Sequence, residues 1–195
     1  MSGPRIVLAS GSPRRAQLLA EAGWDVCIRP ASIDDGMLDA SGHDPRGWTM
    51  AMAWLKARSV VENEASELGE LLFAADTVCS VDGKVFGQPA DREDARAMLN
   101  RMRRGTHEVW TGMCLMRVGG ERHMGARCEE VQIGDLTNDS IDRYLDSEEW
   151  RGKAGAYNLS DRIAAGWPVQ CDGEASSVMG LSLELLDELL EEVDG

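Results

Sequence analysis

The sequence lacks any apolar stretch long enough to cross a membrane. No window approaches the ~18 consecutive apolar residues that a spanning helix needs. The N-terminal residues also lack the architecture of a signal peptide, because the short apolar run Ile6–Ala9 leads directly into polar residues. We therefore expect a cytoplasmic protein without a membrane partner.

Cysteine is sparse and follows no pattern that indicates a disulfide framework or a zinc site. The five cysteines form no Cys-x-x-Cys pair and show no Cys/His spacing suited to zinc. Because they are scattered and odd in number, we expect free, buried thiols in a reducing compartment. They are Cys27, Cys79, Cys114, Cys128 and Cys171.

Basic residues are in the minority. The chain has 20 Lys and Arg residues against 34 Asp and Glu residues, so its formal net charge is -14 at pH 7. This balance argues against nucleic acid or an anionic membrane surface as the default partner. It also makes any local basic cluster informative, because such a cluster attracts an anion against the field of the whole chain.

The chain also lacks internal repeats, low-complexity tracts and long linkers. Its 195 residues suit one α/β domain, or two closely packed lobes around a cleft. Apolar runs bounded by turn signals predict strands, and amphipathic periods after capping residues predict helices. We expect strands at residues 6–8, 24–28, 71–81, 84–86, 106–118, 121–133 and 169–171, and helices that begin after residues 12, 44, 91, 137 and 182.

The sequence LASGSPRR, residues 8–15, predicts the end of a strand, a polar loop and the start of a helix. Ser12 is a good N-cap and Pro13 suits the first helical position. Arg14 and Arg15 then occupy the first turn, where the helix dipole disfavours each cation by roughly 0.3 to 1 kcal/mol. Two interpretations follow: a phosphate-bearing ligand binds there, or the arginines form a solvated surface pair.

Asp76 lies in the middle of the almost wholly apolar run Leu71–Val81. An unpaired carboxylate in a buried strand costs on the order of several kcal/mol. Asp76 therefore ends the buried segment, meets a partner or binds a metal, and we expect it to be functional.

The helix predicted after residue 44 has Trp48, Met52 and Leu55 at helical spacing, which predicts its buried stripe. Lys56 and Arg58 lie at the edge of that stripe. Taken alone, both are expected to be surface cations whose stems pack on apolar neighbours.

Two loops have a chemical character of their own. Residues 29–42 form a polar loop, rich in Gly, Ser and Asp, that suits a lid, with Ile33-Asp34-Asp35 at its centre. Residues 153–157, with the sequence KAGAY, form a loop of small residues whose glycine can let a ligand approach the backbone.

Five segments follow one another along almost the whole chain: LASGSPRRAQLL at 8–19, AADTVCSVDGKVFGQP at 74–89, THEVWTG at 106–112, KAGAY at 153–157 and VMGLSLELL at 178–186. Together they resemble the Maf family of nucleoside triphosphate pyrophosphatases, whose fold is related to the inosine triphosphatase group. The resemblance implies a single domain over residues 1–195. Its fold would be α/β, with a mixed twisted sheet, flanking helices and two lobes around a central cleft.

The resemblance implies hydrolysis of a nucleoside triphosphate between its α and β phosphates, assisted by Mg²⁺ or Mn²⁺. Asp76 matches the acid that the family uses as proton acceptor or water-orienting base. Asp35 matches the family's usual glutamate, which makes Asp35 and Asp76 the candidate metal ligands. The family also leads us to expect a homodimer, with the nucleotide as its small-molecule partner.

The positions matched to substrate contacts are Ser10, Ser12, Arg14, Arg15, Lys56, Thr77, Gln88, Lys153, Tyr157 and Ser160. Two of them depart from the family pattern, which often has Lys in place of Gln88 and Gln in place of Ser160. Both positions are associated with base selection. Arg14 resembles the branch that prefers dTTP and UTP, so the base stays open between pyrimidines and 7-methylguanine or other modified bases.

Two alternatives to an enzyme remain at this point. The changes at Gln88 and Ser160 are compatible with a nucleotide-sensing or partner-binding protein that uses the same cleft without catalysis. A purely structural protein would instead need Asp76 and the two arginines to be paired internally.

Overall fold

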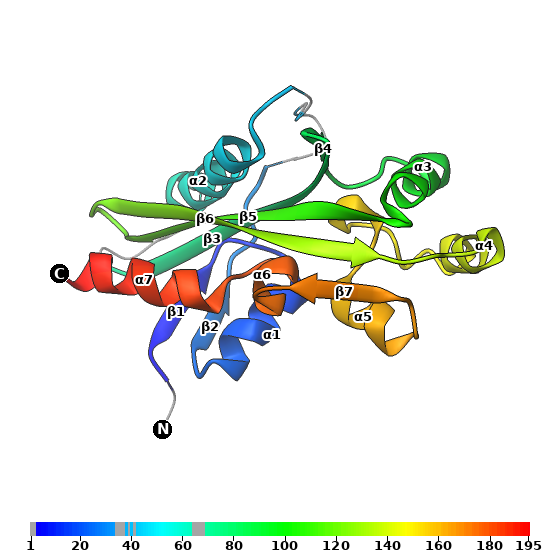
Figure 1. Ribbon diagram of the computed structural model, residues 1–195. Helices are drawn as coiled ribbons and strands as arrows, with labels where there is room; N and C mark the ends of the chain where they lie inside the picture. The colour runs from blue at the N-terminus through cyan, green and yellow to red at the C-terminus, as the bar shows by residue number, and fades with distance from the viewer. Residues whose placement is uncertain (1–2, 34–37, 39, 41, 64–68) are drawn as a thin grey trace.

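The computed structural model describes residues 3–33, 38, 40, 42–63 and 69–195. Its centre is a seven-stranded mixed sheet with the order β2-β1-β3-β5-β6-β7, and β4 pairs with part of β3 (Figure 1). The strands are β1 Arg5–Leu8, β2 Asp25–Ile28, β3 Leu71–Val81, β4 Lys84–Phe86, β5 Gly105–Arg117, β6 Arg122–Ile133 and β7 Val169–Asp172.

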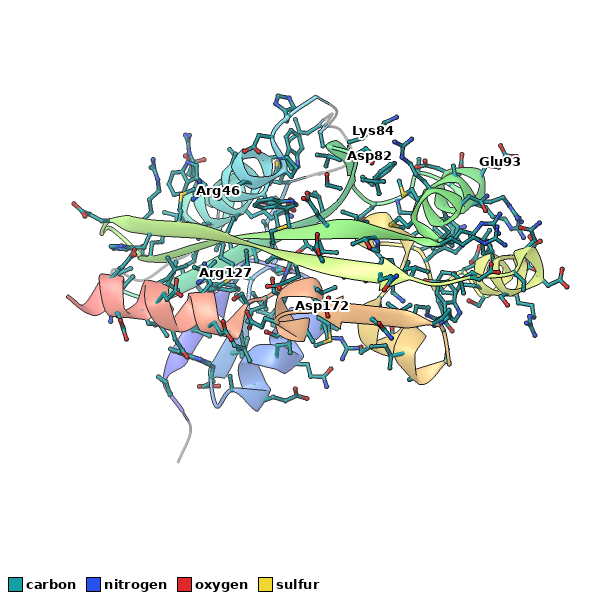
Figure 2. All side chains as sticks on the ribbon, in the orientation of Figure 1. Arg46, Asp82, Lys84, Glu93, Arg127 and Asp172 are labelled. Carbon is teal, nitrogen blue, oxygen red and sulfur yellow. The ribbon has the colours of Figure 1, made fainter. Side chains whose placement is uncertain are left out.

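Three long antiparallel strands, β3, β5 and β6, form the spine of the molecule (Figure 1). The parallel pair β1 and β2 is joined by a helix, as parallel neighbours require, and β1 also lies parallel to β3. Figure 2 shows Asp82 and Lys84 at the tight β3–β4 connection, where the turn signal Asp82-Gly83 predicts a hairpin. The expected strands are confirmed to within two residues at each end.

Seven helices and one 3₁₀ turn are present in the described part of the chain. They are α1 Pro13–Glu21, α2 Pro45–Asn63, α3 Arg92–Met102, α4 Asn138–Asp146, α5 Leu159–Ala164, α6 Ala175–Val178, α7 Leu183–Asp194 and the turn η2 Ala154–Ala156. The predicted helix starts are confirmed, because the side chains of Ser12, Asp44, Asp91, Thr137 and Ser182 accept backbone N–H groups of the first turns. The short helices α5 and α6 were not predicted.

The helix α2 buries only one member of the expected stripe, Met52. Leu55 is 37% exposed and Trp48 is half-buried, whereas Ala53 and Ala57 are fully buried against the sheet. The reason is close approach: a Cβ on Gly112 of β5 would lie 2.3 Å from the Thr49 carbonyl carbon. Small residues let α2 sit directly on β3 and β5.

The cysteine prediction is correct in part. All five cysteines are free thiols, and Cys79 and Cys114 are buried. Burial raises the pKa of each of these two thiols to about 12. Cys128, however, is exposed on β6, where the side chains of residues 128–133 alternate between solvent and core.

The hydrophobic core is divided into two halves along β3. One half gathers around Leu99, Ile141 and Trp150 at the end where α3, α4 and α5 lie. The other half packs on both faces of the sheet at the opposite end, beneath α2 on one face and beneath α1 and α7 on the other (Figure 1). Asp76 and Thr77 fall in the interval between the halves, which explains why polar residues interrupt an apolar strand. The expected fold of two lobes around a cleft is confirmed.

None of the helices among the described residues has the length and apolar character that crossing a membrane would require.

Candidate active site

A cavity of about 540 Å³ opens at the interval between the two halves of the core. It lies beside the part of β3 that neither β1 nor β4 reaches, because β1 pairs with Leu72 and Phe73 and β4 pairs with residues 79–81. Segments from both lobes contribute to its walls. They include Ser10, Ser12, Arg14, Arg15, Lys56, Asp76, Thr77, Gln88, Lys153 and Tyr157.

Asp76 meets a partner inside this cavity. The Lys56 Nζ atom of α2 lies 2.7 Å from Asp76 Oδ1, and the two residues are only 8% and 7% exposed. The expectation that Lys56 is a surface cation is therefore wrong, since the position of α2 turns its ammonium group inward. Arg58 does remain on the surface, where it pairs with Glu62 one turn along the helix. The buried ion pair fixes the orientation of the Asp76 carboxylate.

Arg15 donates hydrogen bonds to three separate segments of the cavity wall. Its Nε donates to the Gly180 carbonyl at 2.7 Å, its Nη1 to Ser10 Oγ at 3.2 Å and its Nη2 to Thr77 Oγ1 at 3.1 Å. The alternative of a solvated surface pair is thus wrong for Arg15. The helix dipole disfavours a cation at the start of α1. The Arg15 guanidinium is nevertheless held there, because it donates to three oxygen acceptors.

Arg14 lies at the mouth of the cavity and joins the two lobes. Its Nη2 donates to Ser160 Oγ at 2.8 Å and to Asp161 Oδ1 at 3.1 Å, so α1 is connected to α5. Lys153 Nζ lies 3.5 Å from the other oxygen of Asp161. One carboxylate therefore holds two of the cations that were predicted to face phosphate.

The KAGAY loop is shaped by packing against the core. Gly155 has a left-handed backbone with φ 62°, and a Cβ there would lie 2.5 Å from Cys79 Sγ. Its N–H donates to the Gly87 carbonyl at 3.0 Å, beside the exposed rim residue Gln88. The packing of Cys79 against the backbone already requires glycine at position 155, and the expected approach of a ligand to this loop stays a prediction.

Tyr157 has its hydroxyl engaged within the core. The hydroxyl oxygen lies 2.8 Å from Nε2 of His107, and both residues are buried. Burial lowers the pKa of His107 to about 4 and raises the pKa of Tyr157 well above its usual value. Both groups are neutral at pH 7, so this pair adds a rigid, uncharged wall to the cavity.

The remaining predicted residues are placed as follows. Ser10 is buried and accepts the Ser12 N–H at 3.2 Å, so the loop before α1 is held by its own serines. Ser160 reaches the site through Arg14. Asp35 lies outside the described residues, as do positions 34, 36, 37, 39 and 41 of the predicted lid.

Comparison with known proteins decides the family. A family model described as Maf-like protein matches residues 5–193 of the chain. The chain belongs to the Maf family. A dTTP/UTP pyrophosphatase from Rhodopirellula baltica is 38% identical over 187 residues, covering 95% of this chain and 81% of the relative. A dTTP/UTP pyrophosphatase from Pyrococcus furiosus is 31% identical over 188 residues, covering 96% and 94%.

A solved structure shares the fold of this Maf protein. The structure of a HAM1 protein from Coxiella burnetii superposes with a TM-score of 0.52 at 18% identity, covering 97% of this chain and 99% of that one. The predicted mixed α/β fold is confirmed by this likeness and by the observed sheet.

The sequence did not indicate several residues that hold the cavity-lining side chains of this Maf protein. Thr111 lies in the segment THEVWTG and bonds to Thr77 from the neighbouring strand. Asp161 directly follows Ser160 and accepts from Arg14, and the Gly180 carbonyl accepts from Arg15. A strand-to-strand pairing of Asp76 and Thr77 with residues 111–112 would have indicated Thr111. Nothing in the spacing indicates Asp161.

Proposed function

We propose that this Maf protein hydrolyses nucleoside triphosphates between the α and β phosphates and releases a nucleoside monophosphate and pyrophosphate. The observation that carries the proposal is the buried Lys56–Asp76 pair, set in a cavity that also collects Arg14, Arg15 and Lys153. A carboxylate among several cations suits an anionic substrate that must be attacked by water. The names of the Maf relatives support the same reaction class.

The proposed substrates are dTTP and UTP. This preference is supported by the relatives named dTTP/UTP pyrophosphatase and by Arg14, which resembles the branch with that preference. In this chain, Arg14 is held by Ser160 and Asp161 across the mouth of the cavity. A family member with glutamine at position 160 would hold this arginine by a different side chain, so the contacts around Arg14 differ in this chain.

Asp76 is the proposed general base. The Lys56 hydrogen bond at 2.7 Å orients its carboxylate, which accepts a proton from the attacking water. The water oxygen bonds to the α phosphorus, and the bond from that phosphorus to the bridging oxygen breaks. Pyrophosphate leaves with the bridging oxygen, while Arg15 and neighbouring cations offset the charge that develops on the phosphates.

A divalent cation is part of the proposal, and the chemistry of the donors fits it. Among the described residues, no group of three or more His, Cys, Asp or Glu side chains gathers to hold a metal. Magnesium, however, usually takes one or two carboxylates together with substrate phosphates and water. Asp76 would supply one carboxylate, and Asp35 is the second by sequence prediction. The bound ion would neutralise phosphate charge.

The test is a nucleotide panel with matched variants. The purified chain is incubated with UTP, dTTP, CTP, ATP, GTP and 7-methyl-GTP, with Mg²⁺, with Mn²⁺ and with a chelator, and the products are separated. Monophosphate plus pyrophosphate, formed fastest from UTP and dTTP, is the expected result. Diphosphate plus orthophosphate, or no turnover of any nucleotide, would overturn the proposal. Tight binding without product over hours would instead support a nucleotide-sensing protein.

A further inference from the structure

The hydroxyls of Thr77 and Thr111 and the backbone carbonyl of Ser177 form a chain of hydrogen bonds behind the cavity wall. Thr77 on β3 and Thr111 on β5 are paired directly across the strands, and their hydroxyl oxygens lie 2.9 Å apart. The Thr111 hydroxyl also donates to the backbone carbonyl of Ser177 at 2.8 Å. Thr111 and Ser177 are both 0% exposed, so water does not compete for the bond between them.

The direction of each hydrogen bond in this chain can be worked out by counting protons. A carbonyl oxygen only accepts, so the single hydroxyl proton of Thr111 goes to Ser177. Thr77 must then be the donor in its bond to Thr111. A guanidinium only donates, so Arg15 donates to Thr77. The bonds run in one direction, from Arg15 through Thr77 and Thr111 to the Ser177 carbonyl.

The two ends of the hydrogen-bond chain, Arg15 and Thr111, both bond to backbone carbonyls of residues 177–180. Arg15 donates its Nε proton to the Gly180 carbonyl, and the Ser177 carbonyl accepts at the far end. The Ser177 N–H in turn donates to the Glu174 carbonyl at 3.0 Å, and the Glu174 N–H donates to buried Glu129. The acceptor that receives the Thr111 proton is therefore fixed in place.

The direction determines what Thr77 can offer to a ligand. Its proton is used by Thr111 and one lone pair by Arg15, so one lone pair remains for the cavity. Phosphate oxygens of a nucleotide are hydrogen-bond acceptors, and an acceptor cannot bond to a lone pair. Thr77 is therefore suited to an N–H or O–H donor of the ligand and not to a phosphate oxygen. The imide N3–H of uracil or thymine is such a donor, whereas cytosine has a lone pair at N3.

We propose that Thr111 is a positioning residue for base selection: it holds the Thr77 hydroxyl as an acceptor and so favours bases with an N–H at position 3. This inference rests on the proposed function, since it identifies how the same cavity distinguishes its substrates. Thr111 does not touch the nucleotide and acts through Thr77.

The test compares Thr111→Val with Thr111→Ser. Valine has the shape of threonine but no hydroxyl, which frees the Thr77 proton to donate into the cavity, whereas serine keeps the hydroxyl. The ratio of kcat/KM for UTP to that for CTP is measured in each. We expect Thr111→Val to lower this ratio about tenfold, mainly through KM, because a polar mismatch is what discriminates such bases. Thr111→Ser should keep it within about twofold.

Two further measurements keep the result interpretable. Binding of UMP and CMP is measured by calorimetry, which needs no turnover and so separates failure of this inference from failure of the proposed reaction. If Thr111→Val does not fold, Thr77→Val removes the same acceptor from the cavity side and should lower the UMP preference equally. An unchanged preference in the folded valine variants, or an equal loss in Thr111→Ser, would overturn the role of Thr111.

Discussion

At the scale of single residues, the site is defined by how its charges are shared. Lys56 is committed to Asp76 deep in the cavity, whereas Arg14 and Lys153 share Asp161 at the mouth. In the inner pair, which is buried, Lys56 orients the carboxylate of Asp76, the proposed general base. The outer group is partly exposed, so its ion pairs contribute little to stability and mainly set the charge that an arriving triphosphate meets.

Replacing Asp161 with asparagine should strengthen substrate binding. The change removes a negative charge beside Arg14 and Lys153, and we expect KM for the preferred triphosphate to fall about two- to fivefold, with kcat nearly unchanged. Steady-state kinetics at low and moderate salt checks this. The matched control is Asp142→Asn, which removes an aspartate paired with Arg92 and Arg96 away from the cavity. A rise in KM for Asp161→Asn would show that Asp161 orients the cations rather than competing for them.

His107 predicts a pH dependence of stability. Burial lowers its pKa to about 4, so between that value and 6.5 the unfolded chain binds a proton that the folded chain does not. The stabilisation is present above pH 6.5 and is lost as the pH falls through 4, by at most about 3 kcal/mol. Urea unfolding at pH 7 and 4.5 measures it. The loss should be smaller in His107→Gln and unchanged in His43→Gln, whose side chain is exposed; equal losses in all three proteins would contradict it.

At the scale of elements, α2 positions Lys56 through close packing on the sheet. Gly112 of β5 leaves room for the α2 backbone, and a Cβ there would lie 2.3 to 2.6 Å from backbone atoms of Thr49 and Met50. The helix axis, and therefore the place of the Lys56 ammonium group beside Asp76, depends on a residue without a side chain.

Gly112→Ala should accordingly affect stability and activity together. Overpacking a well-packed contact typically costs about 1 to 3 kcal/mol, and the shift of α2 would move Lys56 away from Asp76. Denaturant unfolding and the pyrophosphate assay measure the two effects. Gly105→Ala on the same strand is the control, because its nearest neighbour to an added Cβ is 3.7 Å away and it should behave almost as the wild type. Similar results for both alanines would disprove the packing argument.

The elements also show how far the sequence alone can predict this fold. Capping residues such as Ser12 and Asp91 act locally, so helix starts were predictable. The buried face of α2 was predicted only at Met52, because the helix has apolar residues all round and the sheet contacts its small residues, Ala53 and Ala57. Helices of four to six residues such as α6 show too little periodicity to be recognised.

The same limit applies to the cavity. Asp76 was predictable because a carboxylate in an apolar strand is costly, and it needs no neighbour to be noticed. Its partner Lys56 was expected at the surface, and Asp161 gave no signal at all. Both depend on contacts between elements distant in the chain, such as Arg14 with Asp161, and these are set by the tertiary packing of α1 against α5.

At the scale of the whole molecule, an acidic chain places a small group of basic residues, among them Arg14, Arg15 and Lys56, at the boundary between two lobes. The net charge of -14 repels a triphosphate in general, so the cations around the cavity provide the local attraction. The polar interval in β3 and the cavity coincide because the apolar core stops on either side of Asp76 and Thr77. The homodimer expected for the family stays a prediction, which light scattering in solution can measure.

The central claim is that Asp76 activates water for attack at the α phosphorus. Phosphorus NMR of UTP turnover tests it most directly, with wild type, Asp76→Asn and the control Asp172→Asn, an exposed aspartate on β7 outside the cavity (Figure 2). We predict UMP and pyrophosphate signals in wild type and control, and a rate at least about 100-fold lower in folded Asp76→Asn. Orthophosphate and UDP as first products, or a near wild-type rate in Asp76→Asn, would contradict the account.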